Sequence, residues 1–195
     1  MKKFAVLALS AAMVFSLAGC GKNNNKETTT EITEEAVKIT DSLEILTNVW
    51  GTYADDEKFS IAGGDYNNSV MDAPGKFDVS DGESLDSMLG VPQDSAALID
   101  GAASMMHMMN ANTFTAGAYH MADAANQDAF CTKLKDNIMN RQWMCGFPDT
   151  LIIYTVAENY VVAAFGNAEA IESFKTKLAT VYGEGATLNV EESLA

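Results

Sequence analysis

Residues 151–165 read LIIYTVAENYVVAAF, which is two apolar runs separated by the short polar turn Ala157-Glu158-Asn159. Short apolar runs around a polar turn are typical of buried strands and predict a β-hairpin. A helix is predicted to follow, because apolar residues recur at helical spacing at Ile171, Phe174, Leu178 and Val181.

A second copy of this pattern precedes the first. Residues 105–119 align with residues 151–165 without a gap, and a helix with an apolar face of Phe130, Leu134 and Ile138 follows them. Two such ββα units predict an α+β domain, in which an antiparallel sheet of about four strands carries its helices on one face.

The segments on either side of these units add smaller elements. An N-terminal amphipathic helix is predicted over Ile32–Tyr53 from the spacing of its apolar residues. Residues 54–92 are rich in turn residues and acids, so we expect short strands, one of them starting at 59–61, and helical turns over 83–89. A short helix is predicted over residues 94–100. Residues 187–190 are predicted to form either an edge strand or part of a tail.

The acidic segment 54–92 contains Asp78-Val79-Ser80-Asp81-Gly82, which partly resembles a calcium-binding loop. Its glycine is at the fifth position instead of the sixth, and no glutamate occupies the twelfth. This mismatch favours a solvated acidic surface, although the sequence leaves open whether the segment binds a cation.

The N-terminus has the pattern of a lipoprotein signal. Lys2 and Lys3 precede an apolar run that ends in Leu17-Ala18-Gly19-Cys20. This pattern predicts a signal peptide at 1–19, a lipid on the Cys20 sulfur, a tether over 20–31 and one globular extracytoplasmic domain over 32–195. The alternative is an ordinary signal peptide with Cys20 incidental. The lipid would place the protein on the outer face of the cell membrane.

The charge of the chain excludes several classes of partner. After residues 1–19 are removed, 10 basic residues remain against 27 acidic ones, a net charge of −17. Nucleic acid and anionic lipid headgroups would repel such a chain. The lipid on Cys20 is therefore the expected attachment to the membrane.

The remaining cysteines, Cys131 and Cys145, could form a disulfide in an exported protein. The chain would have to fold straight back along the predicted helix, which disfavours the bond. The sequence leaves their pairing open.

No catalytic motif is present. His107 and His120 are the only histidines, and neither has a Ser, Cys or Asp at a recognisable catalytic spacing. The sequence predicts no catalytic residue and no cofactor. It favours a non-enzymatic binding or interaction module for a protein, peptide or small molecule. An alternative is a structural accessory subunit of a membrane complex, with the stripe 39–53 facing its partner.

The first alternative to a binding module, ahead of the accessory subunit, is a metal-handling lipoprotein for Cu(I). Met105-Met106-His107-Met108-Met109 and His120-Met121 supply the thioether and imidazole ligands that Cu(I) prefers. However, a strand sends alternate side chains to opposite faces, so Met105, His107 and Met109 cannot share a site with Met106 and Met108. Methionine is also a common apolar filler, and this interpretation is favoured, without a metal site.

The chain resembles a family of uncharacterised lipoproteins of Gram-positive gut anaerobes that carry a domain of unknown function. The resemblance lies in the lipobox, in Ile45-Leu46-Thr47-Asn48-Val49-Trp50, and in the helix to Arg141-Gln142 that precedes the hairpin Leu151–Phe165. It implies a fold and a location, and no catalytic residue.

Overall fold

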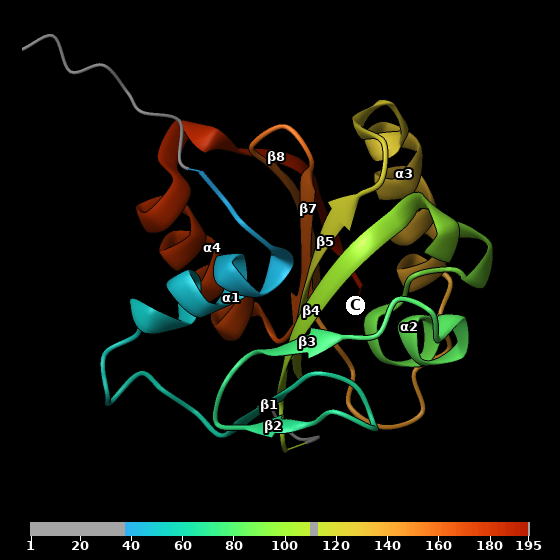
Figure 1. The fold of residues 1–195 in the computed structure, drawn as a ribbon. Helices are drawn as coiled ribbons and strands as arrows, with labels where there is room; N and C mark the ends of the chain where they lie inside the picture. The colour runs from blue at the N-terminus through green and yellow to red at the C-terminus, as the bar shows by residue number, and fades with distance from the viewer. Residues whose placement is uncertain (1–37, 110–112, 195) are drawn as a thin grey trace, which may run out of the picture. The chain divides into compact units, whose positions relative to one another are not determined.

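A single antiparallel sheet runs through the domain (Figure 1). The computed structural model describes residues 38–109 and 113–194, and within them eight strands pair in the order β2-β1-β4-β5-β7-β6-β8, with β3 pairing to β4 as well. The strands are β1 (Ile61–Gly63), β2 (Val70–Met71), β3 (Gly75–Phe77), β4 (Ile99–His107), β5 (Phe114–Met121), β6 (Thr150–Val156), β7 (Tyr160–Gly166) and β8 (Ala186–Ser193).

Four α-helices and three short 3₁₀ segments complete the described part of the chain. They are α1 (Ser42–Gly51), η1 (Gln93–Leu98), α2 (Gly82–Leu89), η2 (Ala124–Asn126), α3 (Gln127–Met139), α4 (Ala168–Tyr182) and η3 (Gly183–Gly185). None of the helices in the described residues is long and apolar enough to cross a membrane.

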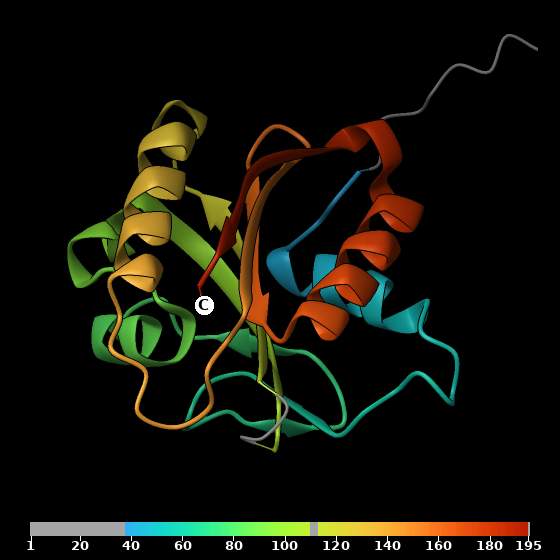
Figure 2. The same cartoon turned by 180° about the vertical axis from the view of Figure 1, so that it is seen from behind.

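The helices cover both faces of the sheet, so the prediction of helices on one face is wrong. Figures 1 and 2 show α1 and α4 on one side, here called the α1/α4 face, and α2 and α3 on the other, the α2/α3 face. The physical reason is that β7 is buried along its whole length, so the apolar side chains on each of its faces need a cover. Val162 packs in the core under α1 and α4, and Val161 packs in the core under α2 and α3.

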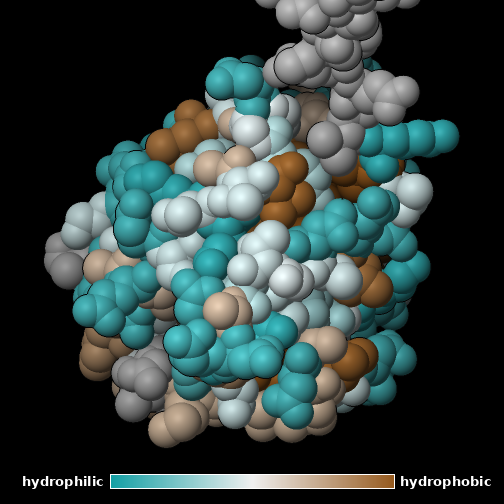
Figure 3. All heavy atoms as spheres, turned by 90° about the vertical axis from the view of Figure 1, so that its left-hand side faces the viewer, coloured by the Kyte–Doolittle hydropathy of each residue, from teal (hydrophilic) through white to brown (hydrophobic). Residues whose placement is uncertain are grey.

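The outer surface of the α1/α4 face is mostly hydrophilic, with apolar atoms only in small separate areas (Figure 3). This is the surface expected of amphipathic helices that direct their apolar sides to the sheet.

The prediction of an α+β domain with two ββα units is confirmed, but the strand number is wrong. The central strands β4, β5, β7 and β6 are those of the two predicted hairpins. The sheet is larger because the turn-rich segment adds β1, β2 and β3 beside β4, and the C-terminal segment adds β8 beside β6.

The two units are not equivalent copies in space. Met106 pairs with Thr115 in the first hairpin, whereas the residues aligned with them in the second unit, Ile152 and Val161, pair elsewhere. The gapless alignment therefore gives the wrong register for one hairpin. Moreover, the two helices that follow the hairpins, α3 and α4, lie on opposite faces of the sheet.

The first helix is shorter than predicted. Within the described residues it begins at Ser42, because the Asp41 side chain accepts a hydrogen bond from the Glu44 N–H at 2.9 Å and caps the helix. Ile45, Leu46 and Val49 are completely buried against the sheet and α4. Trp50 and Tyr53 of the predicted stripe are buried as well, and Ile39 and Leu43 pack partly buried against the same core. The accessory-subunit alternative stays a prediction.

Asp65 organises the turn-rich segment that carries β1, β2 and β3. This buried carboxylate accepts hydrogen bonds from the backbone N–H groups of Asn67, Asn68 and Asp78 at 2.8–3.0 Å. Burial alone would raise the pKa of Asp65, but these donors hold the pKa below its usual value. A single side chain thereby joins both ends of the segment.

Candidate functional site

The end of strand β4 separates two hollows, one on each face of the sheet. His107 lines both of them. The aromatic hollow lies on the α1/α4 face and has a volume of about 320 Å³; the methionine groove lies on the α2/α3 face and has a volume of about 380 Å³.

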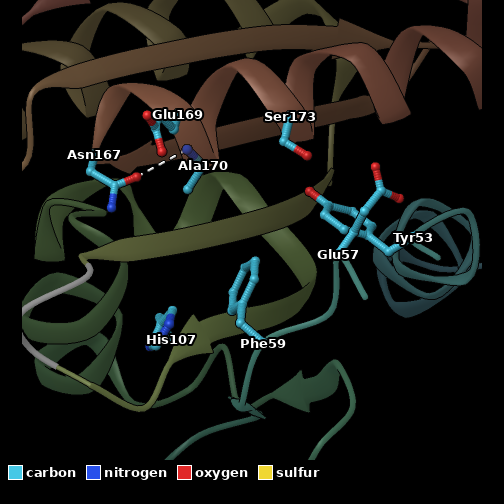
Figure 4. Close-up of a pocket in the computed structure, with 8 residues that line it drawn as sticks. All are labelled: Tyr53, Glu57, Phe59, His107, Asn167, Glu169, Ala170 and Ser173. Carbon is cyan, nitrogen blue, oxygen red and sulfur yellow. Dashed lines mark hydrogen bonds between the residues drawn. The ribbon is translucent and has the colours of Figure 1, made fainter. Parts of the chain in front are cut away.

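The aromatic hollow is built from the loop after α1, the end of β4 and the first turns of α4 (Figure 4). Its lining residues are Tyr53, Glu57, Phe59, His107, Asn167, Glu169, Ala170 and Ser173.

Phe59 is the centre of the aromatic wall. Its ring stacks on the His107 ring, with centroids 4.8 Å apart and planes 9° from parallel. Trp50 and Phe114 contact Phe59 edge-on at 5.3 and 5.6 Å, and Tyr53 lies 6.3 Å away. Such packing fixes the ring positions, so this wall of the hollow is formed in advance of any ligand.

The Tyr53 hydroxyl is the polar group that this packing leaves unsatisfied. Tyr53 is 4 % exposed, and among the described residues its hydroxyl oxygen makes no hydrogen bond of normal geometry, although Ser173 lies close enough to lower its pKa slightly against the effect of burial. Figure 4 shows this hydroxyl directed across the hollow toward the side on which Ser173 lies. Burial raises the pKa of Tyr53 to about 12, so the hydroxyl keeps its proton at neutral pH.

Two carboxylates stand at the rim of the hollow. Glu57 accepts a hydrogen bond from Lys177 Nζ at 2.6 Å, which holds the pKa of Glu57 below its usual value. Lys177 also lies over the Tyr53 ring, 5.2 Å from its centroid. Glu169 is in the first turn of α4, where its negative charge interacts favourably with the helix dipole. With Lys177 offsetting Glu57, the rim keeps one negative charge.

His107 and Asn167 supply donors to the hollow. His107 Nδ1 accepts a hydrogen bond from the Met109 N–H at 2.9 Å, and burial lowers the pKa of His107. The neutral ring therefore carries its proton on Nε2. Asn167 Oδ1 caps α4 by accepting from the Ala170 N–H at 2.9 Å, which leaves the amide nitrogen pointing toward the His107 side of the hollow (Figure 4).

The methionine groove has an apolar floor and one charged residue at its edge. Arg141 Nη2 lies 3.4 Å from Asp86 Oδ1, and the Arg141 guanidinium lies 5.4 Å from the centroid of the Trp143 ring. The lining residues are Ala62, Tyr66, Ser87, Met88, Met106, His107, Met108, Thr115, Arg141, Trp143 and Phe165.

The structure divides the methionine run as strand geometry predicts. Met105 is fully buried on the α1/α4 face, whereas Met106 and Met108 line the groove on the opposite face. Met109 is exposed and does not line the groove. Met121 is buried on the α2/α3 face.

The other candidate residues are engaged in local structure. His120 Nδ1 pairs with Asp100 Oδ1, and Asp78 and Asp81 form the turn and cap that precede α2. Cys131 is buried and Cys145 is exposed, and neither is in a disulfide. Across residues 38–109 and 113–194, no three His, Cys, Asp or Glu side chains are grouped to hold a metal ion. Cys20 lies outside the described residues.

No protein-family model, curated protein or solved structure matches the chain. The resemblance to the lipoprotein family stays a prediction.

Sequence reasoning missed the aromatic hollow altogether. Its parts come from three segments that are distant in the sequence, 53–59, His107 and 167–173, and no local pattern shows that they meet. The available signal was the run of Trp50, Tyr53 and Phe59, whose aromatic side chains continue past the end of the amphipathic stripe.

Proposed function

We propose that this protein is a lipid-anchored extracytoplasmic binding module that takes a small organic ammonium ion into the aromatic hollow. The observation that carries the proposal is the buried Tyr53 hydroxyl, which makes no hydrogen bond of normal geometry among the described residues. A buried hydroxyl without a hydrogen bond costs about 1–3 kcal/mol, and a ligand donor or acceptor placed in the hollow would offset this cost.

The charge at the rim supports a cationic ligand. None of the described residues that line the hollow beside Glu169 is a lysine or arginine, and the chain as a whole has a net charge of −15. A cation is therefore attracted both by the rim and by the field of the whole protein. The aromatic wall adds a further preference, since ring faces attract an ammonium group and ring edges pack against a short apolar chain.

The contacts of His107 support binding without catalysis. Its Nδ1 is occupied by the Met109 N–H, and its ring is held flat against Phe59. The imidazole is thus placed to donate from Nε2, and not to remove a proton from a ligand through Nδ1.

Ligand binding is tested with three compounds of equal chain length: butylammonium chloride, butanol and sodium butyrate. Titrations followed by NMR chemical shifts of the full chain should show butylammonium binding more tightly than butanol, and butyrate not binding. Tyr53→Phe should weaken butylammonium binding by about 2–10-fold, the equivalent of one lost hydrogen bond. Glu169→Gln should weaken it by up to about fivefold, as expected for an exposed ion pair.

Glu158→Gln provides the matched control, because Glu158 is another glutamate, placed in the exposed β6–β7 turn away from the hollow. The Glu158→Gln variant should bind butylammonium with the same affinity as the wild type. Equal binding of all three compounds, or equal losses in the Glu158 and Glu169 variants, would refute the proposed site.

The lipid anchor is a separate part of the proposal, with its own test. The thioether requires the Cys20 sulfur, so Cys20→Ala should abolish labelling by a radioactive fatty acid. The variant should be released from the membrane or retain its signal peptide. Labelling that persists in this variant would contradict the anchor and would leave the proposed hollow unaffected.

A further inference from the structure

The methionine groove brings together three thioether sulfurs from two elements. Met106 and Met108 are two residues apart at the end of β4, and the Met108 N–H still donates to the Ser60 carbonyl at 3.0 Å. The backbone pairing thus extends one residue past β4 to Met108, where the chain bends, and both side chains line the groove. Met88, in the last turn of α2, lines the same groove.

We propose that Met88, Met106 and Met108 form a Cu(I) site. Thioethers are soft, uncharged ligands that select Cu(I) over the harder divalent ions. The three come from α2 and from the end of β4 with the residue after it, and they line one groove together. This inference is independent of the aromatic hollow, which lies on the other face of the sheet.

The site is accessible but largely apolar. Met108 is 49 % exposed, whereas Met88 and Met106 are only partly exposed, so an ion can enter from solvent and then lose most of its water. The nearby Arg141 charge is offset by Asp86. The Trp143 ring also lines the groove and offers an electron-rich surface near the bound cation.

This ligand set differs from the one that the sequence alone suggested. His107 and Met109 are not part of it, since the His107 ring stacks on Phe59 and Met109 lies outside the groove. The two sets can therefore be separated by substitution.

The test measures Cu(I) uptake by the full chain in competition with bicinchoninate, without oxygen. Cys20→Ser and Cys145→Ser are included as background substitutions, because accessible thiolates also bind Cu(I). We expect about one Cu(I) per chain from the single ligand set. Met106→Leu with Met108→Leu should weaken binding at least tenfold, because leucine keeps the apolar volume and removes both sulfurs.

Met109→Leu is the matched control and should bind Cu(I) like the background protein. Circular dichroism checks that each variant is folded, and the methyl signals of Met88, Met106 and Met108 should shift in NMR spectra when Ag(I) is added as a redox-stable substitute. No uptake, uptake unchanged in the double variant, or an equal loss in Met109→Leu would overturn the assignment.

Discussion

Tyr53 and Asp65 are both buried and polar, but they stand in opposite situations. In the described residues the Tyr53 hydroxyl makes no hydrogen bond of normal geometry, whereas the Asp65 carboxylate accepts hydrogen bonds from three backbone N–H groups. An unsatisfied buried group costs stability, while a fully bonded carboxylate contributes to it. Removing the polar atom should therefore have opposite consequences at the two positions.

Tyr53→Phe should leave the free energy of unfolding unchanged or raise it by up to about 1 kcal/mol, because the ring packing is kept and an unsatisfied hydroxyl is lost. Urea unfolding of both proteins without ligand measures the difference. A loss greater than about 1 kcal/mol would show that the hydroxyl is bonded within the folded protein and is not reserved for a ligand.

Asp65→Asn should lower the free energy of unfolding at pH 7 by about 1–3 kcal/mol, because an amide cannot accept from donors on both sides. The pKa of Asp65 is lowered in the folded state, so the stability from its charge is present above the ordinary carboxyl pKa. It is lost as the pH falls through the folded pKa. The difference in the free energy of unfolding between the wild type and Asp65→Asn should accordingly become smaller as the pH is lowered.

Asp56→Asn, at an exposed position, is the control for this measurement and should change stability little at any pH. If the difference in unfolding free energy between the wild type and Asp65→Asn stays constant as the pH is lowered to the acid transition, the charge of Asp65 does not stabilise the fold.

At the scale of elements, the contact between α2 and α3 depends on one glycine. Gly90 ends α2 with a φ of +74°, and a Cβ atom added there would lie 2.5 Å from Ile138 Cγ1 on α3. The position thus combines a backbone conformation that favours glycine with a close approach between two helices.

Gly90→Ala should lower the free energy of unfolding by about 2–4 kcal/mol, since backbone strain and overpacking act together. Thermal and urea unfolding measure the effect. Gly185→Ala is the control, because an added Cβ there meets no atom within 4 Å and the backbone is not left-handed. Similar effects of the two substitutions would show that α3 can move away from α2 at little cost.

The elements themselves were largely predictable, and their pairing was not. The apolar runs at 151–165 and the helical spacing after them identify β6, β7 and α4, because periodicity is a local property of the sequence. Local patterns do not show which face of the sheet a helix covers. The pairing register of a hairpin also depends on the length of its loop. The gapless alignment of 105–119 with 151–165 therefore gives the wrong register for one of the two hairpins.

For the molecule as a whole, negative charge is the dominant electrostatic feature. The chain has 27 acidic and 12 basic residues, and most of the ion pairs in the described part involve exposed carboxylates. Exposed pairs contribute little individually, so repulsion among the excess carboxylates should outweigh them.

Raising sodium chloride from about 10 to 300 mM should therefore raise the unfolding temperature, because the Debye length falls from about 30 Å to less than 10 Å and screens this repulsion. Differential scanning calorimetry at neutral pH measures the change. A lower unfolding temperature at high salt would show that attractive pairs such as Lys177–Glu57 dominate instead.

The unequal burial of the two cysteines has a practical consequence. Burial raises the pKa of Cys131 to about 11, whereas Cys145 is exposed beside Trp143 on the segment after α3. A maleimide dye should then attach to the folded chain at Cys145 alone when Cys20 is replaced, and its emission would report events near the methionine groove. Cys131 would react only when α3 leaves the sheet, so the rate of its alkylation would time that opening.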